Sequence, residues 1–207
     1  MIDVFKSLLS LAKKRPVFHS EADFQHAFAW EIHRQWPAAS IRLEMPYQTH
    51  KHLFYIDIWI VYRAQILAVE LKYKTRSLFI DINNEKYRLK SQRAHDTGRY
   101  DFLKDVYRLE QIKKQYQKYT GYAILLTNDS AYWTKPKNKT FDSAFRIHEG
   151  RVVNGILSWD KKASDGTKKN REQPIVIEGT YQLHWEDYSR LSDDRHGKFR
   201  SLVVKVQ

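Results

Sequence analysis

The sequence predicts a mixed α/β fold, of the α+β type, in which helices pack on a central mixed β-sheet. Three observations support this prediction. Apolar residues repeat at helical spacing in three segments, several short runs are rich in β-branched and aromatic residues, and one apolar run at 121–128 is typical of a buried strand. In chain order these segments give helix, three strands, helix, strand, and then a β-rich tail.

The first two helices are predicted from apolar stripes and from the residues that bound them. A weak stripe opens the chain and ends before Pro16. The second helix begins after Ser20, a good N-cap, and carries Glu21 and Asp23 in its first turn, where carboxylates oppose the helix dipole. Pro37 ends it.

The three strands that follow are predicted from their β-branched and aromatic residues. The run at 41–47 contains Pro46, which favours an edge strand. The runs at 54–62 and 65–73 are close enough in sequence to form a hairpin. A second hairpin is expected around Asn83–Asn84, because asparagine tolerates the positive φ of a tight turn.

A third, longer helix is expected at about 100–119, with Gly121 as its C-cap glycine. We expect one domain over 1–207, with a core at about 18–130 and a β-rich C-terminal extension at about 131–207. Three segments of that extension are strand candidates: 144–147, 174–184 and 201–206.

Composition narrows the class of protein. The chain of 207 residues has a net charge of +12, which commonly reflects a polyanionic partner such as nucleic acid. It has no cysteine, which excludes disulfides, cysteine-based zinc sites and thiol nucleophiles. HExxH, GxSxG and P-loop patterns are missing too. No apolar run is long enough to span a membrane, so no membrane partner and a cytoplasmic location are expected.

Two carboxylates and a lysine form the strongest constellation. If the hairpin turn is centred between Arg63 and Ala64, Asp57 and Glu70 become direct cross-strand neighbours, with Cβ atoms about 5 Å apart. Lys72 lies on the same face of its strand. A shift of one residue would separate the pair, so this register is a testable prediction.

Opposed carboxylates on a mostly apolar face need a compensating charge, because burying them is costly. Mg²⁺ binds carboxylate oxygens and would supply that charge, with Mn²⁺ able to substitute. Such a site suits phosphodiester hydrolysis, in which a metal-activated water attacks phosphorus in line. Lys72 would orient or help to deprotonate the water and stabilise the transition state.

These residues resemble the motif of the PD-(D/E)XK nuclease superfamily, which has the restriction-endonuclease-like fold. Asp57 in YIDIWI and Glu70-Leu71-Lys72 in AVELKYK carry the resemblance. The flanking helix SEADFQHAFAWEI and the segment from RYDFLKDVYRLEQI to GYAILLT extend it over roughly 20–128. The family core has the order α-β-β-β-α-β. The proline of the family's name is absent, since Ile56 precedes the aspartate.

The resemblance implies a set of metal ligands. Members commonly use the Asp, the Glu and the carbonyl between Glu and Lys, which here belongs to Leu71. Many add a carboxylate from the first helix, where Glu21 fits best and Glu31 is the alternative. Separately, Glu44 is a candidate for approaching the metal, although an exposed strand glutamate is the commoner case.

Basic residues elsewhere are candidates for binding the phosphate backbone. On the third helix, Asp101, Asp105 and Arg108 share a face that we expect to be exposed and salt-bridged. The alternative places Arg108 and Gln111 near the site, as relatives do. The candidates for nucleic-acid binding are Arg93, Arg99, Arg108, Lys135, Lys137 and Lys139, together with the basic stretch at 161–171.

The expected function is that of a Mg²⁺-dependent nuclease acting on DNA. The catalytic residues would be Asp57, Glu70, Lys72 and Glu21. Many members of the family form homodimers to cut both strands, so the resemblance allows a homodimer. The alternative is a non-cleaving nucleic-acid-binding module with the same fold, acting within a larger DNA-processing or defence assembly.

Overall fold

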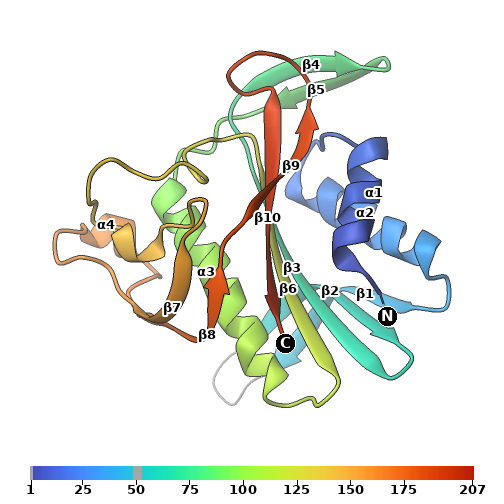
Figure 1. Cartoon of the computed structure of the whole chain (residues 1–207), viewed down its shortest axis with the longest axis horizontal. Helices are drawn as coiled ribbons and strands as arrows, with labels where there is room; N and C mark the ends of the chain where they lie inside the picture. The colour runs from blue at the N-terminus through green and yellow to red at the C-terminus, as the bar shows by residue number, and fades with distance from the viewer. Residues whose placement is uncertain (1, 49–52) are drawn as a thin grey trace.

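A computed structural model describes residues 2–48 and 53–207, and over these ranges the chain is a mixed α+β protein (Figure 1). Within them the helices are α1 (Val4–Lys14), α2 (Glu21–Gln35), α3 (His95–Lys113), the short α4 (Asp165–Lys168) and a 3₁₀ turn, η1 (Ser143–Phe145). The strands are β1 (Ser40–Gln48), β2 (Leu53–Tyr62), β3 (Gln65–Lys74), β4 (Leu78–Ile82), β5 (Glu85–Leu89), β6 (Tyr119–Thr127), β7 (Val152–Leu157), β8 (Ile175–Gln182), β9 (Trp185–Arg190) and β10 (Lys198–Val206).

A central mixed sheet organises the molecule. Its strand order is β1-β2-β3-β6-β10-β9, and every neighbouring pair is antiparallel except β3 and β6, which are parallel. Helices α1 and α2 cover one face, while α3 and the β7–β8 hairpin cover the other (Figure 1). The predicted order α-β-β-β-α-β is confirmed as α2-β1-β2-β3-α3-β6, with the β4–β5 hairpin between β3 and α3.

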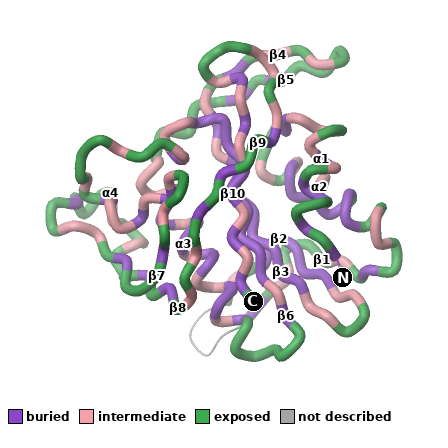
Figure 2. The backbone as a smooth tube through the Cα atoms, viewed as in Figure 1, coloured by how far each residue is buried: buried purple, intermediate pink, exposed green. Residues whose placement is uncertain are grey.

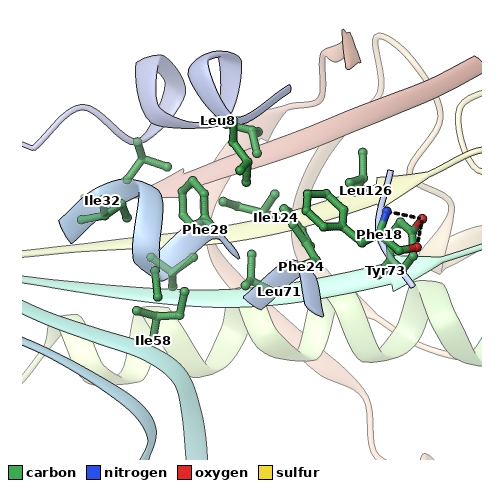
Figure 3. Packing of buried hydrophobic residues seen from close by; sticks show 14 of the residues in the cluster. Leu8, Phe18, Phe24, Phe28, Ile32, Ile58, Leu71, Tyr73, Ile124 and Leu126 are labelled. Carbon is green, nitrogen blue, oxygen red and sulfur yellow. Dashed lines mark hydrogen bonds between the residues drawn. The ribbon is translucent and has the colours of Figure 1, made fainter. Parts of the chain in front are cut away.

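The two N-terminal helices form as their sequences predict. Asp3 caps α1 by accepting from the Lys6 N–H, and Ser20 caps α2 by accepting from the Asp23 N–H. Their apolar faces pack on the sheet in a core that is shown in Figure 3. Burial follows the same layers, being concentrated along the central strands (Figure 2). Among the described residues, no helix has the length and apolar character needed to cross a membrane.

The predicted hairpin register is confirmed. β2 and β3 pair from Tyr62–Gln65 to Ile58–Val69, with Arg63 and Ala64 in the turn. Both turn residues have positive φ, at 48° and 60°, which is the backbone geometry of a tight two-residue hairpin. The second predicted hairpin is also present, with Asn83 and Asn84 at φ 53° and 66°.

The predicted boundaries of the long helix were wrong. α3 ends at Lys113, and Gly121 lies inside β6 instead of capping the helix. The chain must turn here to enter β6 parallel to β3, and the Lys118 carbonyl already accepts from the Ile66 N–H at 2.9 Å. The glycine serves packing, because a Cβ at this position would lie 2.9 Å from the Leu109 Cβ.

The tail differs most from prediction. Strands β8 and β10 match two candidates, but the strand expected at 144–147 is wrong, and this segment follows the turn η1. Phe145 and Ile147 of this segment are buried, but two of the segment's backbone carbonyls accept hydrogen bonds from side chains. Arg151 donates to the Ala144 carbonyl, and Trp185 donates to the Ile147 carbonyl. Because β10 lies between β6 and β9, the tail completes the central sheet.

Candidate active site

The central sheet opens between β2 and β3 at the predicted carboxylate pair. The pairing of β2 with β3 ends at Ile58–Val69, and Asp57 and Glu70 are the next residues on the two strands. Beyond this point, within the described ranges 2–48 and 53–207, β2 pairs with β1 alone, from Met45–Ile56 to the start of β2. The strands therefore fork where the sequence predicted the site.

Carboxylates take the place of the missing strand along β3. The Leu71 N–H donates to Oδ2 of Asp57 at 2.5 Å, and the Tyr73 N–H donates to Oε2 of Glu21 at 2.7 Å. Glu21 reaches this edge because it occupies the first turn of α2, and Nζ of Lys74 lies 3.9 Å from the same oxygen. The fork thus gathers Asp57, Glu21 and the backbone of β3.

Lys72 is held by a residue that sequence reasoning placed elsewhere. Its Nζ lies 2.9 Å from Oδ2 of Asp105 on α3, and Oδ1 of Asp105 accepts from Arg108 at 3.0 Å. The prediction of an exposed, salt-bridged face at Asp105 is wrong about exposure, because the side chain of Asp105 is only 3% exposed. The salt bridge to Arg108 is present. The available signal was the position of Asp105 within the apolar stripe between Phe102 and Leu109.

Burial raises the pKa of two predicted metal ligands, Asp57 and Glu70, and so disfavours their ionised forms. It raises the pKa of Asp57 to about 6, against the opposing effect of Lys72. It also raises the pKa of Glu70 well above its ordinary value, and the neighbouring carboxylates of Asp105 and Asp57 add to that shift. Perturbed carboxyl groups of this kind are typical of functional sites.

Lys72 behaves in the opposite way. Burial alone would lower the pKa of its ammonium, but the carboxylates of Asp105, Asp57 and Glu21 outweigh burial and raise this pKa above its ordinary value. The side chain therefore stays protonated at neutral pH. Its charge partly balances the acidic groups that surround it.

The donor set fits a hard divalent cation. Glu70 is 2% exposed, and its Oε1 has no hydrogen-bond partner within residues 2–48 and 53–207. A buried oxygen without a partner is costly, and Mg²⁺ prefers such carboxylate oxygens. Over the same residues no group of three or more His, Cys, Asp or Glu side chains is arranged to hold a metal ion. The candidate set is therefore the carboxylates of Asp57 and Glu70 and the Leu71 carbonyl, which accepts from Nζ of Lys72 at 3.2 Å. Glu21 accepts from the Tyr73 N–H at the same fork and stays a predicted ligand.

The alternative ligand Glu31 is excluded by its contacts. It is buried on α2 and paired with Lys14 and Arg34, each at 2.7 Å. These hydrogen bonds outweigh burial and hold the pKa of its carboxyl far below its ordinary value. Glu31 thus ties α1 to α2 and lies outside the site.

Glu44 lies next to the site through a residue that sequence reasoning missed. Glu44 lies on β1 between the paired residues Leu43 and Met45, and its side chain is exposed. Nε2 of Gln25 donates to Oε1 of Glu44 and to the backbone carbonyl of Asp57, both at 2.7 Å. Gln25 therefore positions the backbone that carries Asp57, and an amide within a helical stripe gave no distinctive signal for this role.

The basic candidates fall into two groups. The prediction that Arg99 contacts nucleic acid is wrong, because this residue is buried and only 2% exposed. It donates to Asp142 at 2.8 Å and to the Ala131 carbonyl at 2.7 Å. Arg108 belongs to the site, since it pairs with Asp105 and lies over the Phe54 ring. The other four candidates are exposed and stay predictions: Arg93, Lys135, Lys137 and Lys139.

Chemically, the fork gathers the carboxyl groups of Asp57, Glu70 and Glu21, the Leu71 carbonyl and the Lys72 ammonium within a partly buried space. Such a group can bind a divalent cation and stabilise negative charge on a phosphoryl oxygen. These properties come from the residues of this chain alone: no family model, no curated protein and no solved structure matches it.

Proposed function

We propose that this chain is a divalent-metal-dependent nuclease that hydrolyses phosphodiester bonds, with DNA as the expected substrate. The observation that carries the proposal is the convergence of Asp57, Glu70 and Lys72 where β2 leaves β3. Glu70 is the central residue of this argument, because a buried carboxyl oxygen without a described partner calls for a ligand.

The arrangement of elements supports a restriction-endonuclease-like core and membership of the PD-(D/E)XK superfamily. The order α2-β1-β2-β3-α3-β6 agrees with the core that the resemblance implies. In this proposal the β4–β5 hairpin and the strands β7 to β10 are additions to that core.

Asp57, Glu70 and the Leu71 carbonyl would hold Mg²⁺, with Mn²⁺ able to substitute. When bound, such a cation polarises a phosphoryl oxygen and lowers the pKa of a water molecule. Because Lys72 stays protonated, its role is to stabilise negative charge on the phosphate, and it does not accept a proton from the water. Asp105 positions its ammonium through their ion pair.

The second candidate is a module that binds nucleic acid without cutting it. One observation favours it: Lys72 and Asp105 neutralise each other, and Oδ2 of Asp57 is already satisfied by the Leu71 N–H. The negative charge of such a site is therefore partly neutralised even without a bound metal ion.

Plasmid cleavage in Mg²⁺ or Mn²⁺ separates the two candidates. The nuclease proposal expects Asp57→Asn, Glu70→Gln and Lys72→Ala each to lower the rate by about 10²-fold or more. Lys6→Ala, an exposed change on α1 across the sheet, should leave the rate unchanged. Wild-type binding without cleavage would favour the binding module, and cleavage that survives in all three site variants would exclude this site.

A further inference from the structure

An open cleft of about 750 Å³ lies beside the candidate active site. It is bounded by α3, by the first residues of β2 and by the segment at 170–175. Its lining combines aromatic, cationic and amide side chains, among them Phe54, Tyr107, Lys104, Arg108, Gln111 and Asn170. A volume of this size suits a ligand of nucleotide dimensions.

Arg108 connects the cleft to the active site. One end of its guanidinium donates to Asp105, which holds Lys72, and the guanidinium carbon lies 5.2 Å from the centroid of the Phe54 ring. The cleft and the fork therefore share a side chain. A phosphate that meets Arg108 in the cleft would contact the ion-pair cluster that holds Lys72.

The far wall of the cleft is built by specific contacts. Arg171 donates twice to the carboxylate of Asp101 on α3, at 2.7 Å in each bond. The Tyr100 hydroxyl donates to the Gln173 carbonyl at 2.8 Å, and Trp159 donates to the Arg171 carbonyl at 2.7 Å. This wall includes Arg171, the last residue of the basic stretch at 161–171 that is predicted to bind the phosphate backbone.

The charge of the lining favours an anion. Three cationic side chains and, among the residues that the structure describes, no carboxylate line the cleft. Lys114 is paired with Glu178 at 2.5 Å and Arg108 with Asp105 at 3.0 Å, so within the described part of the chain Lys104 is the lining cation without a carboxylate partner. Aromatic rings beside cations are the combination that binds unpaired nucleotides, since bases stack on the rings and phosphates meet the cations.

We propose that this cleft binds the unpaired strand of a polynucleotide and guides it to the fork between β2 and β3. The inference rests on the proposed nuclease function and narrows its substrate to single strands and unpaired ends. A duplex presents its bases in pairs and cannot stack them on Phe54 and Tyr107, so it would gain only the phosphate contacts.

Binding without metal tests this inference independently of cleavage. Fluorescence anisotropy in EDTA would compare labelled 12-nucleotide DNA and RNA strands with the blunt duplex of the same sequence. Phe54→Ala should weaken binding of the strand about tenfold and leave duplex binding nearly unchanged. Lys104→Ala should lower the slope of log affinity against log salt by about 0.7 for the strand. Phe79→Ala, at an aromatic residue that is 66% exposed on β4, is the matched control and should change neither affinity.

Crosslinking gives a second measurement that does not depend on a cleft variant folding. A strand carrying 5-iodouracil should crosslink wild-type protein at Phe54 or Tyr107, as located by mass spectrometry. The inference would be overturned if Phe54→Ala weakened binding of the single strand and of the duplex equally. It would also be overturned if neither Phe54→Ala nor Lys104→Ala changed the affinity for the strand, or if all crosslinks fell on elements outside the cleft. Strand-selective binding without any cleavage would refute the proposed nuclease function but support the strand-binding cleft. Cleavage that the cleft variants leave unchanged would support the nuclease function and refute the cleft.

Discussion

Asp57→Asn should stabilise the folded protein at neutral pH. The pKa of Asp57 rises from an ordinary value of 3.8 to about 6, chiefly because the carboxyl is buried. A difference of one in pKa corresponds to about 1.4 kcal/mol, so ionised Asp57 destabilises the fold by about 3 kcal/mol. Asparagine keeps an oxygen for the Leu71 N–H and carries no charge. Lys72 loses one carboxylate neighbour but keeps Asp105 at 2.9 Å, so the expected gain is about 1–3 kcal/mol.

The sign of the pH dependence makes this prediction specific. A carboxyl with a raised folded-state pKa favours the folded state at low pH, and this contribution is lost as pH rises from about 4 to about 6. Urea denaturation in EDTA should therefore give equal stabilities for wild type and Asp57→Asn near pH 4, and a gain that is complete above about pH 6. Asp165→Asn, at a fully exposed position, should change stability by less than about 0.5 kcal/mol throughout. A destabilised Asp57→Asn at neutral pH, or a difference that does not vary with pH, would refute the argument.

Three further substitutions test the packing around the site. Lys72→Ala leaves the buried carboxylate on α3 without its ammonium partner and should cost about 3 kcal/mol in urea denaturation, whereas a loss below about 1 kcal/mol would contradict a buried pair. Arg99→Ala removes one of the two arginine partners of Asp142, which keeps Arg146 at 3.0 Å, and should cost about 1–3 kcal/mol. Its nucleic-acid affinity in anisotropy should change less than that of Arg93→Ala. Gly121→Ala should cost about 1–3 kcal/mol because its methyl group meets Leu109, and a variant as stable as wild type would show that α3 can move away.

The sequence was most informative where local rules decide the structure. The register of β2 and β3 followed from a two-residue turn, since a shift of one residue would have moved Asp57 to the face of the sheet opposite Glu70. Ser20 marked the start of α2 by the same kind of local chemistry. This register set the predicted carboxylate pair, while the Lys72–Asp105 pair required the packing of α3 against β3.

The missed strands lack the alternation that local reasoning needs. β7 contains Gly155 at φ 70°, and its pairing with β8 shifts between Val153 and Gly155. β9 buries Trp185 and Tyr188, three residues apart, and its pairing with β10 shifts next to Phe199. Bulges of this kind break a period of two, so the apolar pattern of a strand is lost. Asp105 was missed for a different reason, because its role depends on a residue distant in sequence.

The fork between β2 and β3 also has a consequence for solubility. Beyond Val69, β3 has lost β2 as its partner, and such an unpaired edge is a template for pairing with another chain. Here Asp57 and Glu21 occupy the N–H groups of Leu71 and Tyr73, so an incoming strand would find these donors taken. Charged side chains at an edge are a recognised protection against aggregation. Asp57, a proposed metal ligand, and Glu21 thus also protect the open edge of β3 from pairing with a strand of another molecule.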